Sequence, residues 1–190
     1  MQKENVLSTR RVYDGRIINL RLDDVRTPSG IETLREIVEH PGAVAIVAVD
    51  GQNRVLLIRQ YRHAAGRVMI EIPAGTLKPG EDPAACAARE LVEETGYTAA
   101  KLERIGGIHT SPSFCTEYIH LFLATDLTRG AARPEADEHI QVEPTPWAEV
   151  LRRMRAGEIE DAKSISALLL ALVGSNPAWY NAASPSQVTA

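Results

Sequence analysis

A nearly continuous apolar run from Gly42 to Val49 most constrains how this 190-residue chain can fold. Such a run is typical of a strand that is buried on both of its faces. Asp50-Gly51 begins a tight turn, and Arg54–Arg62 is the expected partner strand. Further short strands alternate with few helices along the chain. The sequence therefore predicts an α/β (α+β) fold, in which a mixed β-sheet is flanked by helices.

The segment before this run is expected to be a β-hairpin. Residues 16–23 alternate loosely between apolar and polar side chains, Pro28-Ser29-Gly30 favours a turn, and residues 33–39 resume the extended pattern. The last residues are rich in Ala, Ser and Pro, which predicts a loose tail. We therefore expect three parts: an N-terminal β arm (1–40), a main domain (41–175) and a C-terminal tail (176–190).

Helices are predicted at three places in the main domain. The first follows Asp82, which suits the N-cap, with Pro83 at the first helical position and Gly96 at the C-terminal stop. The others are expected at 147–156 and 162–173. Extended segments are predicted at 69–73, 102–107, 118–124 and 140–143.

Composition excludes several classes of partner. The net charge is −4, the pI is about 5.8 and there is no basic block, which argues against binding of a nucleic acid polymer. The most apolar run, Ile165–Val173, is too short to span a bilayer, and the polar start has no apolar segment behind it. Cys86 and Cys115 have no zinc-ligand spacing and are expected to be free thiols. We expect a cytoplasmic protein without a membrane partner.

The helix after Asp82 carries the clearest chemical pattern. Glu90, Glu93 and Glu94 share one helix face, where three carboxylates repel each other unless a cation or water relieves them. Oxygen ligands at this density suit a hard cation such as Mg²⁺ or Mn²⁺. The opposite face, with Ala84, Ala88 and Leu91, is expected to pack into the core. Taken alone, such a Glu-rich helical stretch is usually a solvated acidic surface.

The surrounding residues decide between these interpretations. The segment from Gly75 to Tyr97 resembles the Nudix box, G-x5-E-x7-R-E-U-x-E-E-x-G-U, in which U is a bulky aliphatic residue. The matching positions are Gly75, Glu81, Arg89, Glu90, Leu91, Glu93, Glu94 and Gly96. Tyr97 departs from the pattern at a position that serves packing. The resemblance implies a Nudix fold and a loop-helix-loop site that binds a divalent cation beside a pyrophosphate.

The resemblance also implies roles for individual residues. Glu90 and Glu94 are expected to be metal ligands, together with the carbonyl oxygen of Ala74, and Glu93 is expected to act beside them. Arg89 would orient the glutamates through ion pairs. The expected cofactor is Mg²⁺, with Mn²⁺ able to substitute.

Residues outside the box indicate the substrate. The stretches Ile58–Arg62 and Glu71–Gly75, Pro112 after the box, the acidic segment Pro134–Glu138 and the N-terminal hairpin are similar to features of ADP-ribose pyrophosphatases. This subfamily implies hydrolysis of ADP-ribose to AMP and ribose 5-phosphate, and a homodimer formed through the arm. The expected substrate-binding residues are Arg59, Arg62, Pro112 and Glu117, with Arg62 the expected phosphate contact because its fork of donors suits phosphate oxygens.

The general base and two alternative functions remain open. Glu138 is our choice for the base because it lies just before an expected strand, while Glu135 and Asp137 are its rivals. A GDP-sugar or other nucleoside diphosphate sugar is the alternative substrate. A module that senses a nucleotide without cutting it is disfavoured, because such modules tend to lose box glutamates and all three are present here.

Overall fold

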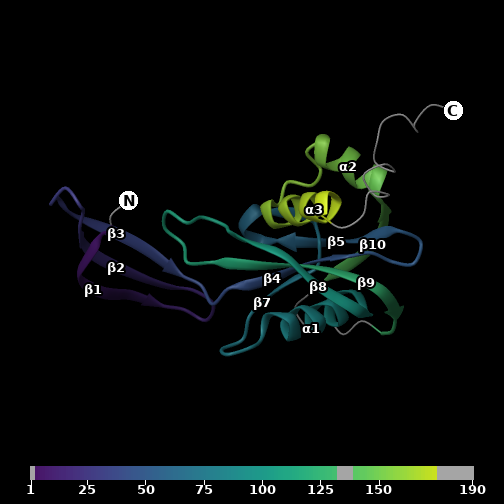
Figure 1. Ribbon diagram of the computed structural model, residues 1–190, viewed down its shortest axis with the longest axis horizontal. Coiled ribbons are helices and arrows are strands. Elements are labelled where there is room, and N and C mark those ends of the chain that lie inside the picture. The colour runs from purple at the N-terminus through teal and green to yellow at the C-terminus, as the bar shows by residue number, and fades with distance from the viewer. Residues whose placement is uncertain (1–2, 132–138, 175–190) are drawn as a thin grey trace. The chain divides into compact units, whose positions relative to one another are not determined.

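The computed structural model describes residues 3–131 and 139–174. These residues divide into two compact units (Figure 1). One unit comprises the described residues up to Gly42 together with His109–Tyr118. The other comprises Ala43–Ile108 and the described residues from Ile119 onward. Each unit has hydrogen-bonded sheets of its own.

The first unit is built on an antiparallel sheet of three strands, in the order β1 (Asn5–Asp14), β2 (Asn19–Arg26) and β3 (Glu32–Glu39). The predicted hairpin corresponds to β2 and β3, which pair from Asn19 and Glu39 to Arg26 and Glu32. The structure adds β1, which the hairpin prediction did not include. Every residue of β1 is exposed, so this strand lacks the alternation of buried and exposed side chains on which a strand prediction depends.

A segment distant in sequence completes this unit. The Val38 N–H donates to the Phe114 carbonyl oxygen at 2.8 Å, and the Thr116 N–H donates to the Val38 carbonyl oxygen at 2.9 Å. The arm predicted over residues 1–40 is therefore joined by part of the segment that follows the box.

The second unit contains two sheets. The larger one has the order β7 (Ala74–Thr76), β4 (Ala43–Ala48), β9 (Tyr118–Arg129) and β8 (Tyr97–His109), with β4 parallel to β9 and antiparallel to β7. The smaller one has the order β10 (Ile140–Pro146), β5 (Arg54–Arg62) and β6 (Arg67–Glu71), all antiparallel. A short 3₁₀ turn, His63–Ala65, connects β5 to β6. The larger sheet is mixed, as the sequence predicted.

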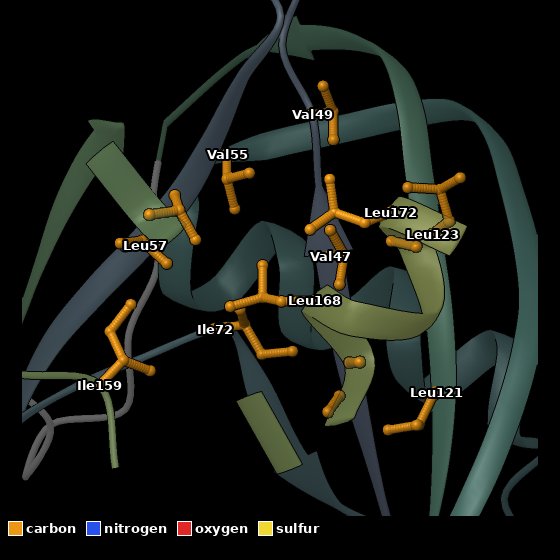
Figure 2. Packing of buried hydrophobic residues seen from close by; sticks show 14 of the residues in the cluster. Val47, Val49, Val55, Leu57, Ile72, Leu121, Leu123, Ile159, Leu168 and Leu172 are labelled. Carbon is orange, nitrogen blue, oxygen red and sulfur yellow. The ribbon is translucent and has the colours of Figure 1, made fainter. Parts of the chain in front are cut away.

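Helices cover β4 on both sides (Figure 1). α1 (Pro83–Thr95) packs on one face, where Val44, Ile46 and Ala48 contact the cluster containing Leu91. α2 (Trp147–Arg155) and α3 (Ala162–Gly174) lie on the other side, where Ala45 and Val47 belong to the cluster containing Leu168 and Leu172 (Figure 2). Every residue of β4 is buried, which confirms the predicted strand with two covered faces.

The observed elements differ from the sequence prediction in two places. The extended segment expected at 69–73 is two strands, because β6 ends at Glu71 and β7 begins at Ala74. The strand expected at 102–107 is part of the much longer β8, whose residues are mostly exposed or half-buried and therefore give a weak apolar pattern. Among the described helices, none is long and apolar enough to cross a membrane.

Candidate functional site

The local sequence defines both ends of α1. The Asp82 carboxylate accepts hydrogen bonds from the backbone N–H groups of Ala84 and Ala85 at 2.9 and 3.0 Å, and Pro83 occupies the first turn. Gly96 ends the helix in the left-handed conformation, with φ of 75°, and its N–H donates to the Val92 carbonyl oxygen. This conformation is unfavourable for residues with a Cβ, so the glycine of the box has a backbone role here.

The face of α1 that enters the core is not the one predicted. Ala84 and Ala88 are exposed, whereas Cys86, Ala87 and Leu91 are buried. Glu90 and Glu94 lie on this buried side, with relative exposures of 9% and 3%. The prediction is confirmed for Leu91 and wrong for Ala84 and Ala88, because it placed the core on the side of the helix opposite the glutamates. Two carboxylates of the box are inside the protein, which is uncommon without a partner or a metal.

Both buried carboxylates meet the backbone of β7. The Glu94 carboxylate accepts a hydrogen bond from the Ala74 N–H at 3.0 Å. Glu90 lies so close to Gly75 that a Cβ at position 75 would be 1.9 Å from its carboxyl carbon and 2.0 Å from Oε1. The first glycine of the box is therefore needed for a close approach between strand and carboxylate, and not for a positive φ. The helix and the strand together bring two carboxylates to one stretch of backbone.

Arg89 organises the remaining acidic residues. Its Nη1 donates to Glu90 at 2.6 Å and to Glu93 at 2.8 Å, while Nε and Nη2 bind both oxygens of Glu81 at 2.9 and 3.0 Å. The hydrogen bonds from Arg89 lower the pKa of Glu81 from its ordinary value to about 2. Hydrogen bonds to Glu81, Glu90 and Glu93 raise the pKa of Arg89, so the Arg89–Glu81 pair stays charged at neutral pH. The resemblance implied ion pairs between Arg89 and the glutamates, and the role of Arg89 in orienting metal ligands stays a prediction.

The donor set around β7 suits a hard cation. Within residues 3–131 and 139–174, no three His, Cys, Asp or Glu side chains form a ready-made metal cage. Two carboxylates with the Ala74 carbonyl make a more open oxygen set, and Mg²⁺ is usually held by one or two carboxylates plus waters and substrate phosphates. Burial raises the pKa of the nearby Cys86 thiol to about 12, so it stays protonated and is a poor zinc ligand.

The two arginines predicted to bind substrate both form ion pairs inside the second unit. Arg62 Nε and Nη2 donate to the two oxygens of Glu71 at 2.8 and 2.7 Å. The hydrogen bonds that Arg62 donates to Glu71 raise the pKa of Arg62, and the charge of Glu94 adds to this effect, so Arg62 lies within electrostatic range of this candidate metal ligand. Arg59 donates to Glu143 at 3.0 Å.

The remaining predicted residues belong to the other unit or lie outside the described residues. Pro112 is exposed and Glu117 accepts a hydrogen bond from the Thr110 hydroxyl at 2.8 Å, and both belong to the unit that contains the arm. Glu138, with its rivals Glu135 and Asp137, lies outside the described residues. Their roles therefore stay predictions.

Sequence analysis missed two residues next to the site, Glu71 and Lys163. Glu71 is only 1% exposed, yet it lies between the buried residues Ile70 and Ile72. An acid inside an apolar run was a usable signal, because a buried carboxylate needs a cationic partner. Lys163 is one of its partners, and nothing in the sequence links these two positions, which are 92 residues apart.

Residues 39–168 match the family described as the NUDIX domain, and residues 4–38 match the nucleoside diphosphate sugar hydrolase N-terminal domain. The first match covers most of the chain, so this protein belongs to the Nudix family. The resemblance seen in the box is thereby confirmed. Members of this family generally act with a divalent metal, and the close packing of Gly75 on Glu90 and the oxygen donors around Ala74 fit such an ion.

Relatives with reported activities extend this picture. The ADP-ribose pyrophosphatase of Bacillus subtilis (strain 168) is 39% identical over 168 residues, covering 87% of this chain and 91% of that protein. The ADP-ribose pyrophosphatase of Mycobacterium tuberculosis (strain ATCC 25618 / H37Rv) is 42% identical over 168 residues, with 86% and 80% covered. A GDP-mannose pyrophosphatase of Cronobacter sakazakii (strain ATCC BAA-894) is more distant, at 36% over 141 residues, with 69% and 73% covered.

A solved structure shares the fold. The crystal structure of an ADP compounds hydrolase superposes with a TM-score of 0.80, covering 90% of this chain and 92% of that chain at 24% identity. At this identity the likeness concerns the fold alone. It confirms the fold class predicted from the sequence.

Proposed function

We propose that this protein is a Mg²⁺-dependent pyrophosphohydrolase that cleaves ADP-ribose to AMP and ribose 5-phosphate, with Mn²⁺ able to substitute. The observation that carries the proposal is the convergence of Glu90 and Glu94 on the backbone of Ala74 and Gly75. The substrate is supported by the two ADP-ribose pyrophosphatases, which match over most of their length and of this chain.

Each residue of the site has a separate proposed role. Glu90 and Glu94 would hold the cation together with the Ala74 carbonyl oxygen, and Arg89 fixes the direction of Glu90 and Glu93 through its hydrogen bonds. When bound, the cation neutralises pyrophosphate charge and lowers the pKa of a water molecule. Burial of both carboxylates keeps competing water away and strengthens their interaction with a cation.

Arg62 is proposed to contact a phosphate through the edge of its guanidinium that faces away from Glu71. Because Nε and Nη2 are bound to Glu71, Nη1 is the donor available for this contact. The bidentate pair also holds the guanidinium plane in one orientation, so less side-chain entropy is lost when phosphate binds. Arg59, Glu117 and Pro112 remain proposed substrate contacts on the strength of the resemblance.

A carboxylate outside the metal site is proposed as the general base. Glu90 and Glu94 are poor bases while they hold a cation, because positive charge lowers the pKa of a carboxylate. Glu138 is our first choice, and Glu138→Gln should lower kcat roughly 10²–10⁴-fold with Mn²⁺ affinity unchanged. If Glu135→Gln or Asp137→Asn shows this loss and Glu138→Gln does not, Glu138 is not the base. Loss in none of the three would make Glu93 and Glu117 the next residues to test.

The N-terminal unit is proposed to form a homodimer. Large apolar side chains of its sheet are exposed, among them Val6, Leu7, Tyr13 and Leu34, with exposures between 44% and 58%. Exposed apolar side chains gathered on one small sheet are typical of an interaction surface. We also propose a cytoplasmic location, with no membrane or nucleic acid polymer as partner.

GDP-mannose or another nucleoside diphosphate sugar is the second candidate substrate, favoured by the GDP-mannose pyrophosphatase among the relatives. The deciding experiment measures kcat/KM for ADP-ribose, GDP-mannose and a nucleoside triphosphate in Mg²⁺, with chromatographic identification of products. Specificity is the ratio of these constants. We expect the highest value for ADP-ribose, with AMP and ribose 5-phosphate as products. A higher value for GDP-mannose would transfer the assignment to the second candidate, and binding without turnover would indicate a nucleotide sensor.

A further inference from the structure

A buried cluster of charged side chains lies at the end of β6, where Glu71 comes three residues before Ala74 of the candidate metal site. The Glu71 side chain is 2% exposed and is bound by two cations, Arg62 at 2.7 Å and Lys163 at 2.5 Å. Burial alone would raise the pKa of Glu71, but the hydrogen bonds and charges of Arg62 and Lys163 outweigh it and hold this pKa below its usual range. Glu71 is therefore ionised at neutral pH and bridges Arg62 of β5 to Lys163 at the start of α3.

The N-terminus of α3 holds the other side of this cluster. The Asp161 carboxylate pairs with Lys163 at 2.9 Å and accepts hydrogen bonds from the Ser164 N–H at 2.9 Å and its hydroxyl at 2.6 Å. The Ser164 oxygen in turn accepts a hydrogen bond from the Ile72 N–H at 3.0 Å. Two neighbouring residues of the chain, Glu71 and Ile72, are thus fixed to the same helix end.

The same fixation continues along the chain into the candidate metal site. The Pro73 carbonyl oxygen accepts a hydrogen bond from the Ile46 N–H at 2.8 Å, the Ala74 N–H donates to Glu94, and Gly75 packs on Glu90. Every residue from Glu71 to Gly75 therefore has a specific anchor. The anchors of Glu71 and Ile72 come from Arg62, Lys163 and Ser164. None of these three residues is a proposed metal ligand.

We infer that Lys163 and Ser164 are positioning residues, which hold the segment 71–75 so that the Ala74 carbonyl and the two box glutamates form one cation site. Lys163 acts through Glu71, and Ser164 acts through the Ile72 N–H. Mg²⁺ requires near-ideal octahedral geometry, so a small displacement of the Ala74 carbonyl weakens its binding. Groups that orient metal ligands without touching the metal commonly change affinity 10–100-fold when removed.

The test measures Mn²⁺ affinity by electron paramagnetic resonance of free Mn²⁺, without substrate, on the full chain. Lys163→Met should weaken Mn²⁺ binding about tenfold or more, because the tie between α3 and Glu71 is lost while Arg62 still compensates Glu71. Lys163→Arg should recover most of the affinity, since it restores a cation at Glu71. Lys101→Met is the matched control, because the ion pair between Lys101 and Asp126 is largely exposed. The Mn²⁺ affinity of this variant should equal that of the wild type.

Ser164→Ala provides a second variant that keeps all charges and removes the acceptor of the Ile72 N–H. Like Lys163→Met, this variant should bind Mn²⁺ more weakly than the wild type. Circular dichroism checks that it is folded. Wild-type Mn²⁺ affinity in folded Lys163→Met and folded Ser164→Ala would overturn the positioning role and leave the proposed function standing. The inference rests on that function, so a wild-type chain that binds no Mn²⁺ would overturn both.

Discussion

Replacing Gly75 with alanine tests the close contact at the centre of the site. A Cβ at this position would be 1.9 Å from the Glu90 carboxyl carbon and 2.4 Å from its Cγ, whereas real Cβ contacts essentially never fall below 3.0 Å. Either β7 or the Glu90 side chain must therefore move by about 1 Å. β7 is paired to β4 at Ala43, Val44 and Ala45, so we expect the carboxylate to move.

The expected magnitude follows from this displacement. Overpacking a well-filled site costs about 1–3 kcal/mol of stability. A carboxylate displaced by about 1 Å cannot keep the short, directional bond that Mg²⁺ requires, and misplacement on this scale costs on the order of 10²-fold in turnover. The Arg89 hydrogen bond to Glu90, 2.6 Å long, would be strained by the same movement. Gly75→Ala should therefore lose both stability and activity, while remaining folded.

The assay compares Gly75→Ala with Gly51→Ala. A Cβ at position 51 meets no atom within 4 Å and needs no positive φ, so this variant should keep wild-type kcat and stability. Urea unfolding gives the stability change, and ADP-ribose turnover in saturating Mg²⁺ gives the change in kcat. Gly75→Ala with wild-type kcat and wild-type Mn²⁺ affinity would refute the proposal that Glu90 is held against β7 as a metal ligand.

Three further predictions concern Glu94, the pH dependence of the Glu81–Arg89 pair and the N-terminal arm. Glu94→Gln keeps an acceptor for the Ala74 N–H but removes the charge, so kcat should fall by orders of magnitude with the melting temperature retained; an unchanged kcat with higher stability would indicate a merely structural acid. The Arg89 pair lowers the pKa of Glu81 from 4.5 to about 2, so its stabilisation is present above pH 4.5 and is lost as the pH falls toward 2. The difference in unfolding free energy between wild type and Glu81→Gln should therefore be constant from about pH 5 to 7 and shrink below about pH 4.5, and a difference that grows on acidification would contradict the pair. The intact chain should be a dimer in light scattering, and a chain lacking residues 1–40 should be a monomer or aggregate without activity; a native wild-type monomer would contradict the proposed assembly.

Much of the second unit could be predicted from the sequence, because the informative signals there are local. The uniform apolar character of β4 predicted its two covered faces, and Asp82, Pro83 and Gly96 predicted both ends of α1. These residues act on neighbours within a few positions. The spacing of the box glutamates predicted that they share a side of the helix, but not that Glu90 and Glu94 are buried.

The missed features depend on contacts that only the folded chain makes. Glu90 and Glu94 are tolerated inside because Arg89 and the backbone of β7 compensate them. Ala84 and Ala88 were wrongly assigned to the core because they lie on the side of the helix opposite the glutamates. The pairing of Arg62 with Glu71 depends on how β5 and β6 align, which no local pattern specifies. β1 was not predicted as a separate strand because it is exposed along its whole length and shows no alternation of apolar and polar side chains.

The most direct test of the account is a crystal of the full chain soaked with Mn²⁺ and examined by anomalous diffraction. The account predicts a Mn²⁺ peak bonded to a carboxylate oxygen of Glu90, a carboxylate oxygen of Glu94 and the carbonyl oxygen of Ala74, each at about 2.0–2.3 Å. Arg89 should remain bound to Glu81, and Cys86 should not be a ligand. A peak held by other residues, or none at these three oxygens, would contradict the proposed metal site and the hydrolytic function that depends on it.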